Sequence, residues 1–98
     1  MKIYFVDIDG TICTNTDGNY QKSIPIHKNI EQINKLYLEG NTIIYWTARG
    51  SVTGIDWYDL TKKQLDLWHV KYHDLRMGKP HYDHFICDKA INADDYFK

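Results

Sequence analysis

Residues Lys2–Val6 (KIYFV) form an apolar run typical of a strand, and this run is followed directly by Asp7-Ile8-Asp9-Gly10-Thr11. Side chains alternate along a strand, so Asp7 and Asp9 leave on the same side of the chain. The carboxyl edge of an open α/β sheet is where such folds hold their ligands. Two ionised carboxylates at one strand end repel each other, which suggests that a cation or a proton-transfer task holds them there. Taken by itself, so short a pattern is also explained by a charged strand exit with an ordinary glycine turn.

Length and composition indicate a single domain over residues 1–98. The chain is 43% apolar and 14% aromatic, which suffices for a packed core. Its formal net charge of −1 offers no basic surface, so no nucleic-acid partner is expected. No apolar run approaches the roughly 20 residues of a membrane span, so no membrane partner is expected. We expect a soluble cytoplasmic protein with reduced thiols at Cys13 and Cys87, and homo-oligomer formation is left open.

Hydrophobic patterns divide the rest of the chain into alternating strands and helices. Strands are expected at 2–6, 41–46, 70–75 and 84–87, and helices between Pro25 and Gly40, at 56–69 and at 92–97. The turn-forming composition of residues 14–23 predicts an exposed loop or flap above the acidic pair. The order of the elements predicts a parallel sheet with right-handed crossovers.

Further polar residues follow the other expected strands. They are Thr47, Ala48 and Arg49 after the second strand, Lys79 in the turn after the third, and Asp88 after the fourth. Because parallel strands end at one edge of the sheet, we expect these residues to converge with the acidic pair in one site. A nucleophile, a proton donor, a hydroxyl, a cation and a further carboxylate suit an attack on phosphorus.

Taken singly, several of these residues have a purely structural explanation. Thr47 is explained equally well as a loop cap, and Lys79 beside Pro80 as a solvated turn lysine. The Arg49 guanidinium suits either an oxyanion or a surface ion pair. It is their order along the chain that favours a common site.

In this order the motifs resemble the haloacid dehalogenase (HAD) superfamily of phosphatases and phosphotransferases over nearly the whole chain. Asp7-Ile8-Asp9-Gly10-Thr11 matches the first motif of that family, and Thr47, Lys79 and Asp88 match the second, third and fourth. The resemblance implies a Rossmann-like three-layer α/β/α fold with a four-stranded parallel sheet. The intervals between the motifs are too short for a cap domain, so a compact capless type is implied.

The resemblance also implies roles for the matching residues. Asp7 would attack phosphorus and form an aspartyl phosphate, and Asp9 would protonate the leaving oxygen and then activate water. Thr47 would bind a phosphoryl oxygen, and Lys79 would offset the negative charge. The implied substrate-binding residues are Gly10, Thr11, Ala48 and Arg49.

Magnesium is the cofactor that the resemblance implies. The ion would bridge the Asp7 carboxylate, the backbone carbonyl of Asp9 and the Asp88 carboxylate, which are hard oxygen ligands. The fourth motif usually presents two acids, whereas here Cys87 precedes Asp88 and Asn92 follows it. This departure bears on metal affinity more than on the reaction class.

The implied function is a Mg²⁺-dependent phosphomonoester hydrolase acting on a small phosphorylated substrate. The layout around 47–49 and 79–80 is most similar to short HAD-type proteins associated with capsule and surface-polysaccharide biosynthesis, which implies a sugar or polyol phosphate. One alternative is a catalytically weak phosphate- and metal-binding module of the same fold. Another is a receiver-like signalling domain, which would place adjacent acids after the first strand and a phosphoacceptor after the third.

Overall fold

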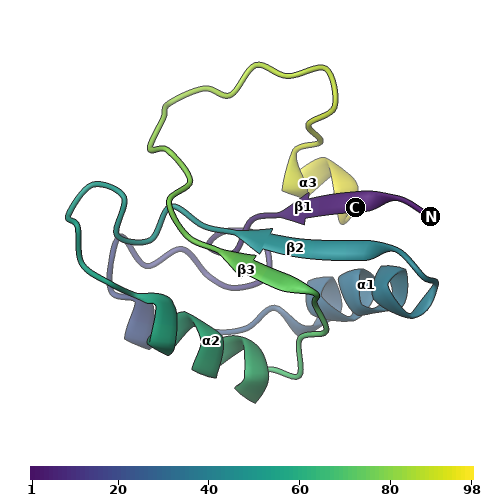
Figure 1. The fold of residues 1–98 in the computed structure, drawn as a ribbon, viewed down its shortest axis with the longest axis horizontal. Coiled ribbons are helices and arrows are strands. Elements are labelled where there is room, and N and C mark those ends of the chain that lie inside the picture. The colour runs from purple at the N-terminus through teal and green to yellow at the C-terminus, as the bar shows by residue number, and fades with distance from the viewer.

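The computed structural model describes residues 1–98, and its sheet has three parallel strands (Figure 1). The strands β1 (Ile3–Val6), β2 (Thr42–Trp46) and β3 (Asp74–Arg76) lie side by side in this order. Phe5 is in register with Ile44, and Trp46 with Arg76. All three strands therefore end at the same edge of the sheet, as the sequence predicts.

Two helices cover one face of this sheet. The helix α1 (His27–Leu38) joins β1 to β2, and α2 (Tyr58–Leu67) joins β2 to β3. Both crossovers run in the same direction across the sheet, and right-handed connections of that kind place their helices on the same side. Figure 1 shows both helices below the strands. The core between them contains Val6, Ile43, Tyr45 and Leu75 from the sheet and Ile30, Ile33 and Leu65 from the helices.

The helix α1 ends where the sequence predicts. Gly40 takes a φ of +94°, a left-handed conformation that glycine adopts without steric cost. Its amide donates to the Tyr37 carbonyl at 3.1 Å, and the Asn41 amide donates to the Leu36 carbonyl at 3.2 Å. This pair of bonds is a Schellman motif, and it turns the chain into β2.

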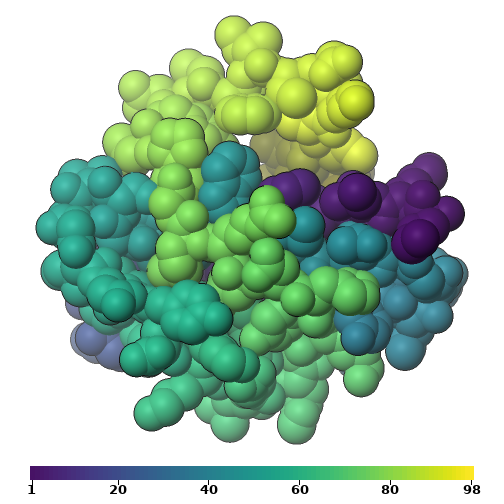
Figure 2. Space-filling view, viewed as in Figure 1, coloured from purple at the N-terminus to yellow at the C-terminus, as the bar shows by residue number.

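The prediction of a fourth strand at residues 84–87 is wrong. Residues 77–92 form neither strand nor helix, and residues 81–92 are exposed, with Ile86 97% accessible. The segment arches above the sheet in Figure 1 and makes up the yellow-green upper part of the molecule in Figure 2. Its apolar run has only Phe85 and Ile86 as large residues between Asp83 and Asp88, which is too little apolar surface to hold a strand on the sheet.

The expected three-layer α/β/α arrangement is reduced to two layers, one sheet and one layer of helices. No helix connects a fourth strand, so the second face of the sheet lacks a helical layer, and Ile3 and Phe5 on that face are 68% and 53% exposed. The short helix α3 (Ala93–Tyr96) brings the chain back towards β1, and Phe97 is buried in the main core.

Other elements are shorter than expected. The helix expected at 56–69 spans Tyr58–Leu67, and the strand expected from residue 70 begins at Asp74. Leu67, the last residue of α2, is 74% exposed. None of the helices is both long and apolar enough to span a membrane.

The one-sided core predicts different responses to the same substitution on the two faces of the sheet. Ile43→Val is expected to lower the free energy of unfolding by about 1 kcal/mol, because it removes a methyl group from a fully buried side chain. Ile3→Val, on the exposed face, is expected to change it by less than about 0.5 kcal/mol. Urea titrations of both variants measure this difference, and equal losses would contradict the one-sided core.

Candidate active site

The two carboxylates are held at the end of β1 by a tight turn. Gly10 has a φ of +79°, and the chain folds back so that the Thr11 and Ile12 amides donate to the Ile8 carbonyl at 3.1 and 2.9 Å. The Gly10 amide donates to the Cys13 carbonyl at 2.9 Å. The predicted phosphate-binding amide of Gly10 is therefore already engaged within the turn.

Asp7 is paired with Lys79. The Lys79 Nζ lies 3.7 Å from the Asp7 Oδ1, and the lysine side chain is only 16% exposed. The backbone fixes the lysine, because its amide donates to the Thr47 carbonyl at 3.1 Å and its carbonyl accepts from the Ser51 hydroxyl at 2.6 Å. The structure thus brings three of the predicted catalytic residues together at the carboxyl edge of the sheet.

The surroundings of Asp7 oppose its ionisation. Burial raises the pKa of the Asp7 carboxyl above its usual value, and the neighbouring Asp9 charge adds to this effect. Lys79 and the Ile8 amide act in the opposite direction without cancelling it. A ligand that brings positive charge to Asp7 would therefore be favoured at this position.

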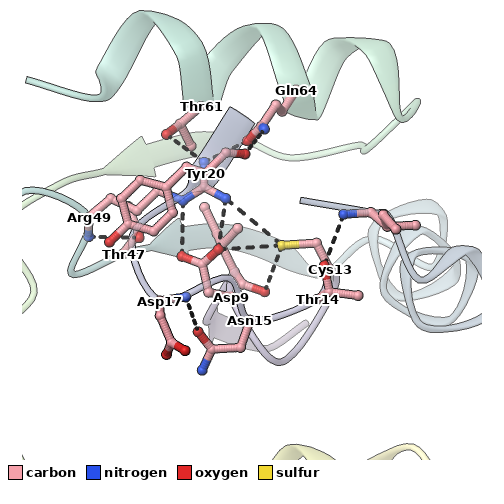
Figure 3. A network of polar contacts seen from close by, with 12 residues as sticks. Asp9, Cys13, Thr14, Asn15, Asp17, Tyr20, Thr47, Arg49, Thr61 and Gln64 are labelled. Carbon is pink, nitrogen blue, oxygen red and sulfur yellow. Dashed lines mark hydrogen bonds and ion pairs between the residues drawn. The ribbon is translucent and has the colours of Figure 1, made fainter. Parts of the chain in front are cut away.

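Asp9 is paired with a different cation, Arg49 (Figure 3). The Arg49 Nε donates to Asp9 Oδ2 at 2.9 Å and its Nη2 donates to Asp9 Oδ1 at 2.8 Å, which is a two-point ion pair. The arginine side chain is completely buried and the aspartate side chain is 18% exposed. The Cys13 thiol lies 3.5 Å from Asp9 Oδ1, and burial raises the pKa of this thiol to about 12, so it stays protonated at neutral pH.

The remaining predicted substrate-binding residues lie around these two pairs. Thr47 is buried, and its hydroxyl accepts a hydrogen bond from the Arg49 amide at 3.1 Å while keeping its own hydrogen to donate. The Ala48 amide makes no backbone hydrogen bond, so it can serve an anion, whereas the Ile8 amide already interacts with the Asp7 carboxylate. Thr11 is buried, and its carbonyl accepts from the Asn29 side chain at 2.8 Å.

The predicted metal ligands are only partly assembled. The molecule has no group of three or more His, Cys, Asp or Glu side chains placed to hold a metal ion. Asp88 lies in the exposed segment 81–92, where its Oδ1 accepts a weak hydrogen bond from the neighbouring Cys87 thiol at 3.8 Å. Asn92 caps α3 by accepting from the Asp94 amide at 2.9 Å. Since Mg²⁺ commonly takes one or two carboxylates and completes its shell with water and phosphate, Asp7 and the Asp9 carbonyl supply part of a suitable site.

Three residues that contact the Arg49 side chain, Tyr20, Thr61 and Gln64, were not predicted from the sequence. The Arg49 Nη1 donates to the Thr61 hydroxyl at 3.1 Å and to Gln64 Oε1 at 2.6 Å, and the ring of Tyr20 lies over the guanidinium at 4.5 Å. Thr61 and Gln64 share the buried face of α2 with Leu65. Polar residues at this i, i+3 spacing on an apolar helix face were the available signal.

Comparison with known proteins places the fold. A scan against protein-family models and a search of curated proteins each gave no match. Among solved structures, a structural-genomics target from Vibrio cholerae matches with a TM-score of 0.88 and 28% identity, over 99% of this chain and 88% of that one. A D,D-heptose 1,7-bisphosphate phosphatase from B. bronchiseptica, complexed with magnesium and phosphate, matches with a TM-score of 0.60 and 20% identity.

These likenesses define the class of fold. The match to the heptose bisphosphate phosphatase covers 89% of this chain and 54% of that one, so the chain spans about half the length of that phosphatase. The fold is the HAD-like α/β fold, built here on three parallel strands instead of the four expected.

The raised pKa of Asp7 predicts the pH dependence of stability. Burial makes ionisation of Asp7 harder in the folded than in the unfolded chain, so its stabilising contribution is complete below the unfolded pKa and is lost as pH rises through the folded pKa. Asp7→Asn is therefore expected to melt at a higher temperature than wild type at neutral pH with chelator present, and this gain should vanish below about pH 4. Thermal melts of wild type and Asp7→Asn between acidic and neutral pH measure this difference, with the exposed Asp59→Asn as the control. A lower melting temperature for Asp7→Asn at neutral pH would show that loss of the Lys79 pair dominates.

Proposed function

We propose that this protein is a Mg²⁺-dependent phosphatase that hydrolyses phosphomonoesters of a small metabolite through an aspartyl phosphate on Asp7. The observation that carries the proposal is the Asp7–Lys79 pair at the carboxyl edge of a HAD-like sheet. A nucleophilic carboxylate beside a fixed cation suits phosphoryl transfer, which depends on positioning and on neutralising negative charge.

In the proposed reaction, an Asp7 oxygen forms a bond to phosphorus while the bond from phosphorus to the leaving oxygen breaks. Lys79 offsets the charge of the phosphoryl group, and Thr47 donates its free hydroxyl hydrogen to a phosphoryl oxygen. A proton reaches the leaving oxygen, and water then attacks phosphorus to release inorganic phosphate and restore Asp7. Asp9 Oδ2 has one lone pair beyond its bond to Arg49 Nε, so in the proposal this oxygen carries the proton that passes to the leaving oxygen and takes a proton back from the attacking water.

Magnesium, when bound, would offset charge on the phosphoryl oxygens. Asp7 and the Asp9 carbonyl would hold it, and Asp88 is the proposed third protein ligand. The heptose bisphosphate phosphatase of similar fold, which was crystallised with magnesium and phosphate, supports both the cofactor and a phosphorylated sugar or polyol as the substrate class. We also propose that the substrate belongs to surface-polysaccharide biosynthesis, and this part of the proposal rests on the sequence resemblance alone.

A second candidate function is a phosphate-binding module with little or no turnover. It is favoured by one observation, the lack of a complete cluster of metal-ligating side chains. Such a module would bind inorganic phosphate beside Lys79 without releasing phosphate from esters.

The first test is phosphate release from a panel of sugar phosphates, polyol phosphates and an aryl phosphate. Wild type is expected to release phosphate with Mg²⁺ and not with chelator, and Asp7→Asn to lose at least about a thousandfold in rate because the nucleophile is gone. Asp59→Asn, an exposed acid on α2, is the matched control and should keep full activity. Phosphate binding without release by wild type would favour the binding module, and full activity of folded Asp7→Asn would contradict the proposal.

The role of Asp88 has its own test. Asp88→Asn is expected to raise the Mg²⁺ concentration for half-maximal activity by about tenfold, the lower end of what loss of a metal-site group costs. Asp83→Asn, in the same exposed segment, should leave it unchanged. A Mg²⁺ titration of turnover measures both, and identical curves for the two variants would remove Asp88 from the ligand set.

A further inference from the structure

The side chain of Arg49 has no donor left for a ligand. A guanidinium carries five N–H groups. Two reach the Asp9 oxygens, two reach Thr61 Oγ1 and Gln64 Oε1 at 3.1 and 2.6 Å, and the Nη2 also lies 3.9 Å from the Cys13 sulfur. The side chain is completely buried. An arginine so placed is poorly suited to contact a phosphate directly.

The face of the guanidinium is covered as well. The Tyr20 ring lies over it with 4.5 Å between the Arg49 Cζ and the ring centroid, and Trp57 packs edge-on against Tyr20 at 5.0 Å between centroids. Figure 3 shows Tyr20 over the arginine on one side and the Asp9 carboxylate at its fork. This covering excludes water from the ion pair, which strengthens it.

Gln64 joins the arginine to the loop above the site. Its Oε1 accepts from Arg49, and its Nε2 donates to the Tyr20 carbonyl at 2.6 Å. Tyr20 begins the short helix η1 (Tyr20–Lys22) within the loop expected at 14–23. The base of this loop is fixed by the Thr14 amide, which donates to the Ile24 carbonyl at 2.9 Å.

We propose that Arg49 is a positioning residue that fixes the Asp9 carboxylate at two points, with Thr61, Gln64 and Tyr20 holding the arginine in turn. Its catalytic consequence depends on the proposed phosphatase function, because Asp9 is the group suited to proton transfer there. A carboxylate free to rotate would spend little time in the productive geometry, and small displacements of catalytic groups cost about a hundredfold in rate. The arrangement also makes the position of Asp9 depend on the loop that carries Tyr20.

The geometry can be tested without turnover, because the chain has only two arginines, Arg49 and Arg76. Arg76 is the matched control, since its Nε donates to Asp74 Oδ2 at 2.9 Å in a pair that is about half exposed. In ¹H–¹⁵N spectra at neutral pH, the Arg49 Nε–H signal should exchange slowly with water and the Arg76 signal rapidly. The Arg49 signal should move in Asp9→Asn, stay in Asp74→Asn and barely respond to inorganic phosphate. Rapid exchange of the Arg49 signal, or a large response to phosphate, would overturn the proposal.

The catalytic consequence is tested with Arg49→Lys, which keeps the charge and loses the fork. We expect kcat to fall by about a hundredfold while the Kd for inorganic phosphate stays within about twofold of wild type. Gln64→Leu, which removes both polar atoms of that side chain, should lower kcat in the same sense, and Arg76→Lys should change neither quantity. A weaker phosphate affinity with unchanged kcat in Arg49→Lys would make Arg49 a phosphate ligand and overturn the positioning role. If wild type releases no phosphate at all, the proposed function fails, while the spectra and the phosphate titration still decide how Arg49 is used.

Discussion

The structure depends on two ion pairs, because each of the two carboxylates at the end of β1 is neutralised by its own cation. Asp7 is paired with Lys79 across 3.7 Å, whereas Asp9 is held by the buried fork of Arg49. Removing one partner of the buried Arg49–Asp9 pair would leave an uncompensated charge and cost about 3–5 kcal/mol, so this pair links the stability of the fold to the site. The two pairs also differ in access, because Asp7 is 42% exposed and Arg49 is enclosed. One cation is thus available to a ligand and the other is committed to the protein.

The committed cation also connects elements that are distant in sequence. Arg49 follows β2, Asp9 follows β1, and Gln64 lies on α2, where it reaches both the arginine and the carbonyl of Tyr20. Burying a polar side chain without its hydrogen bonds costs free energy, so the two bonds of Gln64 favour this packing of α2. The site is therefore shaped by the same contacts that set the packing of the helix and the loop.

Much of this arrangement could be predicted from the sequence where the signal is local. The strand before Asp7, the glycine end of α1 and the pairing of Lys79 with the acidic edge follow from alternation, backbone conformation and parallel topology. The prediction of a fourth strand was wrong because a run with only two large apolar residues gains too little free energy from burial to join the sheet. The end of α2 was also misplaced, since His69 takes the left-handed position with a φ of +58° where no glycine marks it. Gln64 was missed because its partners lie 15 and 44 residues away.

In the proposed mechanism, Lys79 contacts the phosphoryl group and Arg49 fixes the Asp9 carboxylate. A crystal structure of the protein with Mg²⁺ and beryllium fluoride, a mimic of an aspartyl phosphate, tests this most directly. We expect the beryllium fluoride group on Asp7, contacted by Lys79 and the Thr47 hydroxyl, with the two-point pair between Arg49 and Asp9 intact. An Arg49 side chain turned away from Asp9 to contact the fluorides would contradict it.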